Sequence, residues 1–256
     1  MMAFKHPVYN TSLQFNSAYS SRLLDIYKAQ EESEIRMQCA GTKSRTFAPS
    51  GMRCARKQWF RLRGTETDPV ERPDSALNFR ADVGSARHIV IQSRLRRALG
   101  ADWIEVPDFL RDHPIPYQYH ILQSDIESLI EIDSPPIKFA VDGIIRIDEK
   151  MFLLEIKTCD YTALEAMQSH KKHHEDQVTF YCTILGLRDV LFLYEERQNG
   201  GMKCFQHKVS EYDVSMLQAR MALIMDMANR NIAPDRLPTN DYMCSNCEYA
   251  KKCAEW

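Results

Sequence analysis

Three charged residues, Asp142, Glu155 and Lys157, stand among apolar residues of the two predicted strands in FAVDGIIRIDEKMFLLEIKT, which covers residues 139–158. The aliphatic and aromatic runs on either side of the polar segment 148–150 predict two strands joined by a tight turn. Side chains alternate between the two faces of a strand, so Glu155 and Lys157 point to the same side, about 7 Å apart. An antiparallel hairpin brings Asp142 back beside them. The sequence therefore predicts two carboxylates and an ammonium group at one end of a sheet.

Two carboxylates and a lysine can form a metal-dependent phosphodiesterase site. Mg²⁺ and Mn²⁺ prefer oxygen ligands, and paired carboxylates supply them. The metal polarises a phosphoryl oxygen and lowers the pKa of a bound water, which becomes a nucleophile at neutral pH. A lysine can orient that water or stabilise negative charge on the phosphate. The alternative is a surface hairpin on which Glu155 and Lys157 form a solvated ion pair.

Other polar residues could complete such a site from neighbouring helices. His88 offers a nitrogen ligand that Mn²⁺ tolerates better than Mg²⁺, unless it is an ordinary exposed histidine. Gln177 and Tyr181 are four residues apart and share one face of a helix, where they could hydrogen-bond a phosphate or stack on a base. The alternative places Tyr181 in the core and Gln177 on the surface. One further group of histidines is predicted to be a solvated helix surface: His170, His173 and His174.

Three of the eight cysteines crowd the end of the chain, in the pattern Cys244-x₂-Cys247-x₅-Cys253. In a chain without a secretion signal, clustered cysteines indicate a metal or cluster site rather than a disulfide framework. Cys54 offers a fourth thiolate. Three basic neighbours are expected to lower its thiol pKa: Arg53, Arg56 and Lys57. Four thiolates suit either structural Zn²⁺ or a [4Fe–4S] cluster, and the spacing leaves both open.

The segment around Cys54 combines basic and aromatic side chains: Arg53, Arg56, Lys57, Trp59, Phe60 and Arg61. Such a segment could line the path of a DNA single strand, with arginines on phosphates and an aromatic ring on a base. The alternative is that Trp59 and Phe60 are buried beside the cysteines.

Composition is that of an ordinary globular protein. The chain has 256 residues, of which 44% are hydrophobic and 27% charged, enough to bury a core. No run of 18 apolar residues predicts a membrane span, and the start of the chain lacks the apolar region of a signal peptide, so a cytoplasmic protein is expected. The formal net charge of −2 means that a nucleic acid must be held by local patches.

Helical and strand patterns alternate along the chain, which predicts an α/β fold with a mixed central sheet flanked by helices. Helices are predicted at residues 21–38, 53–63, 83–99, 163–167, 175–185 and 216–227. Besides the hairpin, strands are predicted at residues 119–122, 190–194 and 204–209. We expect an N-terminal arm and helix at 1–50, a core at 51–243 and a C-terminal cysteine module at 244–256.

The order and spacing of these residues resemble the RecB-like branch of the PD-(D/E)XK nucleases. The resemblance rests on these motifs: His88, Asp142, Glu155-Ile156-Lys157 and Gln177-x₃-Tyr181. One cysteine upstream of the histidine and three at the C terminus are similar to the iron–sulfur subgroup, which includes the CRISPR-associated four-cysteine exonucleases, the AddB-type nuclease domains and similar phage exonucleases. One departure is Ala140-Val141-Asp142, which lacks the proline of the superfamily motif, at a position where RecB-like members vary.

The resemblance implies a restriction-endonuclease-like core with a small C-terminal iron–sulfur module. It implies four ligands for Mg²⁺ or Mn²⁺, the last through its backbone carbonyl: His88, Asp142, Glu155 and Ile156. Lys157 would orient the attacking water, while Gln177 and Tyr181 would contact DNA near the scissile phosphate. It favours a [4Fe–4S] cluster over zinc, held by Cys54, Cys244, Cys247 and Cys253. The implied activity is a metal-dependent DNA exonuclease, acting on single-stranded ends.

Two other functions stay open from the sequence. One is a DNA-end-processing subunit of a recombination or CRISPR-adaptation complex, which would work with a helicase, integrase or recombinase. The other is a restriction-type endonuclease, which would also cut circular DNA.

Overall fold

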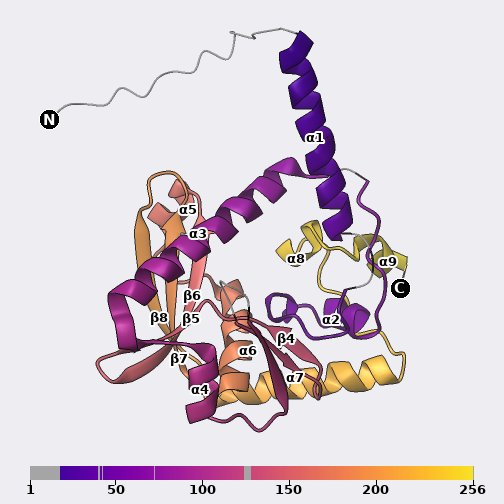
Figure 1. The fold of residues 1–256 in the computed structure, drawn as a ribbon. Coiled ribbons are helices and arrows are strands. Elements are labelled where there is room, and N and C mark those ends of the chain that lie inside the picture. Colours follow the sequence, from indigo (N-terminus) through magenta and orange to yellow (C-terminus); the bar gives the residue numbers. More distant parts are fainter. Residues whose placement is uncertain (1–17, 40, 42, 72, 124–127, 256) are drawn as a thin grey trace, which may run out of the picture.

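A five-stranded mixed sheet forms the centre of the computed structural model, which describes residues 18–39, 41, 43–71, 73–123 and 128–255 (Figure 1). The strand order is β1-β5-β6-β7-β8, and β6 and β7 are the one parallel pair in this sheet. The strands are β1 (Trp103–Ile104), β5 (Gly143–Ile147), β6 (Lys150–Cys159), β7 (Asp189–Glu196) and β8 (Met202–Lys208). The predicted α/β fold with a mixed central sheet flanked by helices is confirmed.

The predicted hairpin is formed by β5 and β6. Its register pairs Gly143 with Leu154 and Ile147 with Lys150, which leaves a two-residue turn. Asp148 and Glu149 both have positive φ, 48° and 64°, as a tight hairpin turn requires. This turn fixes the register, and the register decides that Glu155 and Lys157 share one face of β6.

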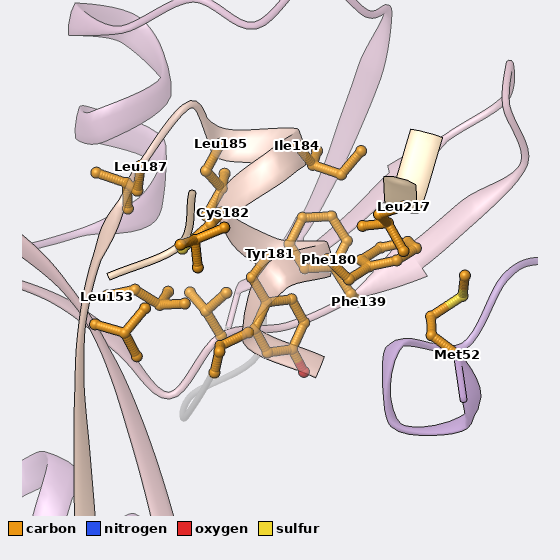
Figure 2. Packing of buried hydrophobic residues seen from close by; sticks show 14 of the residues in the cluster. Met52, Phe139, Leu153, Phe180, Tyr181, Cys182, Ile184, Leu185, Leu187 and Leu217 are labelled. Atoms are coloured by element: carbon orange, nitrogen blue, oxygen red, sulfur yellow. The ribbon is translucent and has the colours of Figure 1, made fainter. Parts of the chain in front are cut away.

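Helices cover both faces of the sheet. On one face α3 (Ser75–Leu99) packs against β6 through Ile91, with Leu95 and Leu99 beside the same cluster, as their four-residue spacing predicts. On the other face lies α6 (Glu175–Leu185), whose apolar side chains pack with Leu153 of β6 (Figure 2). The chain reaches α6 from β6 through α5 (Tyr161–Ala166) and a 3₁₀ turn (Lys172–His174), and then enters β7. A parallel strand pair needs such a helical crossover.

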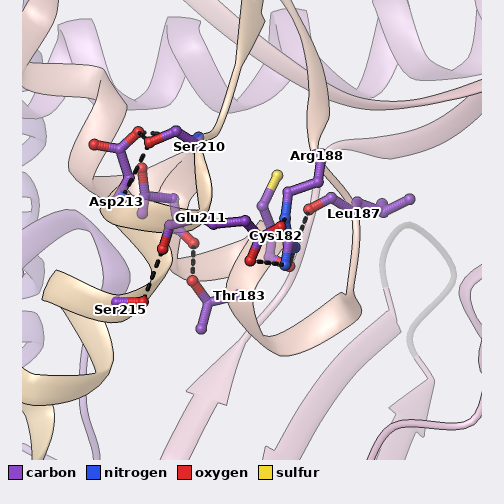
Figure 3. A network of polar contacts seen from close by, with 9 residues as sticks. Cys182, Thr183, Leu187, Arg188, Ser210, Glu211, Asp213 and Ser215 are labelled. Carbon is purple, nitrogen blue, oxygen red and sulfur yellow. Dashed lines mark hydrogen bonds and ion pairs between the residues drawn. The ribbon is translucent and has the colours of Figure 1, made fainter.

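A polar network joins the end of α6 to the start of β7 and of α7 (Glu211–Asn229) (Figure 3). The guanidinium of Arg188 donates to the carbonyl oxygens of Leu187 and Cys182 and to the carboxylate of Glu211. Ser210 begins α7 with a capping box that includes Asp213. These bonds occupy polar groups that the helix ends would otherwise leave without partners.

A smaller antiparallel sheet adjoins the core and consists of β2 (Tyr119–Gln123), β3 (Ser128–Ile132) and β4 (Ile137–Phe139). Phe47 forms an isolated bridge with Ile137 and is fully buried, so a residue of the segment 1–50 belongs to the main core. The sequence patterns did not predict β1 or α4 (Val106–Asp112), which are too short to show a periodicity.

The N-terminal helix α1 (Ala18–Cys39) extends away from the rest of the molecule (Figure 1). Farther along, α2 (Ala55–Leu62) packs against α7, and the ring of Phe60 stacks on that of Tyr249 with 5.0 Å between centroids. The chain ends in two short helices, α8 (Tyr242–Ser245) and α9 (Ala250–Glu255). Within the described part of the chain, every helix is too short or too polar to span a membrane.

Candidate active site

Asp142 lies immediately before β5 and is held there by hydrogen bonds on both sides. Pairing between β5 and β6 ends at Gly143 and Leu154, and the N–H of Ile156, two residues farther along, donates to Asp142 Oδ2 at 2.6 Å. The other carboxylate oxygen lies 3.2 Å from Nδ1 of His88 on α3. The point at which the two strands diverge therefore places this carboxylate beside the centre of β6.

Two residues of α3, one turn apart, face Asp142. His88 approaches its carboxylate, and the side-chain amide of Gln92 donates to its backbone carbonyl at 2.9 Å. Burial disfavours the charged imidazole, but the hydrogen bond to Asp142 and the charge of Asp142 outweigh it, so the pKa of His88 is raised. The sequence prediction included His88 but missed Gln92, because an uncharged helix residue carries no distinctive signal.

Glu155 and Lys157 form an ion pair on the α6 face of β6. The Glu155 residue is only 1% exposed, so the alternative of a solvated surface pair is wrong. Burial raises the pKa of Glu155 to about 7; the neighbouring charge of Asp142 acts in the same direction and Lys157 opposes it. The structure thus brings the two carboxylates and the ammonium group together.

Lys157 begins a chain of hydrogen bonds that leads into α6. Its Nζ donates to Oε1 of Gln177 at 3.1 Å, and Nε2 of Gln177 donates to the Tyr181 hydroxyl at 2.8 Å. Tyr181 is buried and its ring stacks on Phe139, with 5.4 Å between centroids. Tyr181 is therefore a core residue whose hydroxyl group reaches the site, and Gln177 orients the lysine.

The donor atoms suit a hard divalent cation: two carboxylates, one imidazole and the carbonyl group of Ile156. A buried carboxylate with a raised pKa, next to a second carboxylate, is an arrangement that a cation would stabilise. In this conformation Glu155 is directed to Lys157. The described residues contain one group of three potential ligands whose donor atoms all lie within 4.8 Å of one another, and it is elsewhere: His170, Glu175 and His207.

The four cysteines that were predicted to bind a metal or cluster line one cavity of about 160 Å³ between α2 and the C-terminal helices: Cys54, Cys244, Cys247 and Cys253. Cys54 is the N-cap of α2, and its sulfur accepts a hydrogen bond from the N–H of Lys57 at 3.4 Å. Burial raises the pKa of the Cys54 and Cys247 thiols, and for Cys54 the hydrogen bond from Lys57 does not reverse this. The expectation of a lowered Cys54 pKa is therefore wrong.

The charged side chains of the three basic neighbours bind other groups instead of the Cys54 thiol. Arg53 pairs with Asp241 at 2.9 Å and Lys57 pairs with Glu248 at 2.7 Å. The buried guanidinium of Arg56 donates to the carbonyl oxygen of Pro234 at 2.6 Å. These contacts join α2 to the C-terminal segment.

One part of the predicted single-strand path, the stacking of Trp59 or Phe60 on a base, is wrong. Trp59 is 1% exposed and its indole N–H donates to the carbonyl oxygen of Met227 at 3.3 Å, so the ring cannot stack on a base in this conformation. Arg61 donates to the carbonyl oxygen of Thr46 at 3.2 Å. The alternative, in which Trp59 and Phe60 are buried beside the cysteines, describes what the structure has.

Two further features of the site surroundings differ from the sequence expectation or were missed by it. His170 and His174 are half-buried rather than solvated, because their rings stack on Phe192 and Tyr194 of β7. Arg87 pairs with the buried Glu195 and holds α3 against β7 next to His88, a contact that the sequence did not predict. The sequence does show a glutamate at the end of an apolar strand. Its partner is 108 residues away, and no local pattern identifies it.

Comparison of the sequence with protein-family models finds no match, and comparison with curated protein sequences finds none. Among solved structures, the crystal structure of SSO0001 is similar, with 13% identity and a TM-score of 0.47 over 91% of this chain and 96% of that chain. An alkaline exonuclease (LHK-Exo) from Laribacter hongkongensis is similar with 11% identity and a TM-score of 0.39, over 79% and 93%. The structure of LHK-Exo in complex with dAMP is similar with 11% identity and a TM-score of 0.37, over 78% of this chain and 93% of that chain. The chain is thus distantly similar to these structures over most of its length.

Proposed function

We propose that this protein is a metal-dependent deoxyribonuclease, an exonuclease that acts on single-stranded DNA ends. The observation that carries the proposal is the convergence of Asp142, Glu155 and Lys157, with Glu155 buried beneath α6. Burying a carboxylate is unfavourable even when a lysine pairs with it, so packing alone does not explain a buried Glu155 and a half-buried Asp142 beside one lysine. The site resembles that of the RecB-like PD-(D/E)XK nucleases in residue types, order and spacing.

Each residue has a specific role in the proposed reaction. Four groups would hold Mg²⁺ or Mn²⁺: the imidazole of His88, the carboxylates of Asp142 and Glu155, and the backbone carbonyl of Ile156. When bound, the metal supplies Lewis acidity toward the phosphate and lowers the pKa of a water molecule. Lys157 positions the attacking water opposite the leaving group, and Gln177 holds the lysine in place.

The proposed assignment of the cysteine cavity is a structural [4Fe–4S] cluster, with Zn²⁺ as the alternative. Four sulfurs bound tetrahedrally to one zinc at 2.3 Å would lie roughly 3.8 Å apart. What supports the cluster over zinc is the resemblance of the cysteine pattern to that of the iron–sulfur subgroup; among the described residues, no three cysteine sulfurs lie within 4.8 Å of one another. Such a cluster would join residue 54 to the C-terminal segment and close a loop of roughly 200 residues.

The test of the nuclease proposal is digestion of DNA labelled at either end, single- or double-stranded, with Mn²⁺, Mg²⁺ or EDTA. We expect Lys157→Ala and Asp142→Ala to abolish metal-dependent release of nucleotides. Lys150→Ala is the matched control, because Lys150 is on the same strand but pairs with Asp189 at its other end. Undiminished cleavage by folded Lys157→Ala protein would overturn the assignment. Cleavage of closed circular DNA would indicate an endonuclease instead.

The test of the cysteine assignment is iron, sulfide and zinc analysis of protein purified without oxygen, with its visible absorption. We expect about four irons per chain in the wild type and their loss in Cys247→Ser. Cys204→Ser is the control, because Cys204 is exposed on β8 and does not line the cavity. Colourless protein with one zinc per chain would overturn the cluster proposal.

A further inference from the structure

A second group of metal-ligand side chains lies on the α6 face of the sheet, apart from the candidate active site. It consists of His170, which precedes the 3₁₀ turn, Glu175, the first residue of α6, and His207 near the end of β8. Their donor atoms all lie within 4.8 Å of one another, and all three residues are half-buried. Three separate elements therefore meet at one point with two imidazoles and a carboxylate.

The packing around this group orients the donor atoms. The His170 ring stacks on Phe192 of β7, with 4.7 Å between centroids and 11° between planes, and its Nε2 lies 2.9 Å from Oε1 of Glu175. The His207 ring lies 4.8 Å from that of His170 at an angle of 59°. Among the described residues we find no hydrogen-bond partner for the ring nitrogens of His207. The third ligand thus points into the group with a nitrogen that other contacts do not use.

We propose that His170, Glu175 and His207 bind a divalent transition-metal ion of the zinc type. Two imidazoles exclude a site designed for Mg²⁺ or Ca²⁺, which take oxygen ligands, and favour Zn²⁺ and its neighbours in the first transition series. Two histidines and one glutamate are a known ligand set for zinc, and three protein ligands leave a fourth position for water. This proposal does not depend on the nuclease function.

The electrostatics of the group are compatible with a cation. Burial lowers the pKa of His207, which keeps the imidazole neutral and its lone pair available. Burial acts to raise the pKa of Glu175, but hydrogen bonds from Lys172 and His170 outweigh it, so the pKa is lowered and the carboxylate is ionised. Lys172 is the competing cation, and it binds the other carboxylate oxygen. Its side chain is 89% exposed, so it can turn into solvent when a metal enters.

A metal at this position would cross-link β8 to the beginning of α6. Glu175 is two residues before Gln177, which orients Lys157 in the candidate active site. The site would also anchor the segment that carries His174, whose Nδ1 lies 2.7 Å from the Tyr194 hydroxyl. Occupancy therefore should raise the thermal stability of the folded chain, because the unfolded chain cannot bring these three ligands together.

The test measures Zn²⁺ bound at equilibrium by the purified full-length protein and by three single variants: His170→Gln, Glu175→Gln and His207→Gln. We expect each variant to bind one zinc fewer than the wild type. Zinc bound at the cysteines or the candidate active site is common to all four proteins and cancels. His173→Gln is the matched control, because this exposed histidine of the same segment is outside the group, and it should bind as the wild type does. Equal stoichiometry in the wild type and the three variants would overturn the proposal.

Co²⁺ provides a second measurement that separates this site from the cysteines. We expect the wild type to show d–d absorption from cobalt bound to nitrogen and oxygen. In His207→Gln this absorption should fall by the share of one cobalt per chain, while the share from the candidate active site and the sulfur-to-cobalt charge-transfer absorption are unchanged. Glu175→Gln should cause the same loss of absorption. This substitution is at the start of α6, so it serves as the test if the substitution in β8 prevents folding. If the band lost in these variants is the sulfur charge-transfer band, the metal is at the cysteines and the proposal is wrong.

Discussion

The carboxylate of Asp142 accepts a 2.6 Å hydrogen bond from the backbone N–H of Ile156, the residue between Glu155 and Lys157. One side chain therefore has two roles. It supplies negative charge to the candidate site, and it accepts a hydrogen bond from a backbone N–H of β6 beyond the end of the pairing with β5. The two roles can be separated by substitution, because an amide oxygen can accept the same hydrogen bond without carrying charge.

We predict that Asp142→Asn keeps most of the stability but loses activity, while Asp142→Ala loses both. The alanine variant leaves the Ile156 N–H without its partner, which should lower the free energy of unfolding by about 1–3 kcal/mol. DNA cleavage should fall by more than about a hundredfold in each, because a metal ligand and its charge are gone. Urea unfolding and end-labelled DNA digestion measure the two effects. Equal stability of the two variants would show that the hydrogen bond contributes nothing.

The pair of Glu155 and Lys157 should weaken the fold when only one partner is removed. Lys157→Met removes the cation that opposes the raised pKa of the buried Glu155, so folding must then bear either an unpaired charge or the uptake of a proton. At alkaline pH we expect a loss of about 3 kcal/mol. Adding Glu155→Gln should restore much of that stability, because the remaining buried group is then neutral. Urea unfolding in EDTA measures both variants without a contribution from metal. A double variant less stable than Lys157→Met would contradict this account.

The hairpin and its three charged residues were predictable because their determinants are local. Alternating apolar residues and the turn at Asp148 and Glu149 fix the register, and the register alone puts Glu155 and Lys157 on one face. The long helices followed from their periodicity in the same way, although α3 begins at Ser75 rather than at residue 83 and α7 at Glu211 rather than at residue 216. The position of His88 opposite Asp142, 54 residues away, follows from how α3 crosses the sheet, which no local pattern encodes.

Other expectations failed because the partners of charged groups could not be seen in the sequence. Arg53 and Lys57 stand next to Cys54 along the chain but pair with Asp241 and Glu248, so the thiol is governed by burial instead. The histidines at 170 and 174 were expected in solvent for the same reason, since the aromatic strand that covers them comes later in the chain. Charge near a residue in sequence is a poor guide to charge near it in space.

Arg87 should position α3, and with it His88, through its pair with Glu195. The guanidinium donates two hydrogen bonds to a carboxylate that is 2% exposed. We expect Arg87→Met to destabilise the protein by about 3 kcal/mol and to reduce DNA cleavage, while Glu195→Gln is milder because no buried charge is left unpaired. Urea unfolding and DNA digestion measure both.

The matched control is Arg96→Met on the same helix. Arg96 pairs with Glu105, and both side chains are more than 40% exposed, so its loss should change stability and activity little. If Arg96→Met is as damaging as Arg87→Met, the effect comes from α3 itself rather than from the pair with Glu195.

Tyr249 should make stability fall at alkaline pH. Its side chain is fully buried, and among the described residues its hydroxyl has no hydrogen-bond partner. Burial raises its pKa from 10 to about 12, so the unfolded chain releases this proton at a lower pH than the folded chain does. The free energy of unfolding is therefore unaffected by this group below pH 10 and decreases as the pH rises from 10 through 12.

Tyr249→Phe keeps the ring stacked on Phe60 and removes the buried hydroxyl, so it should be about 1 kcal/mol more stable at pH 7. Urea unfolding of both proteins between pH 7 and pH 11.5 measures this, and the variant should lose less stability above pH 10. Parallel curves for the two proteins would show that the Tyr249 hydroxyl does not titrate with folding.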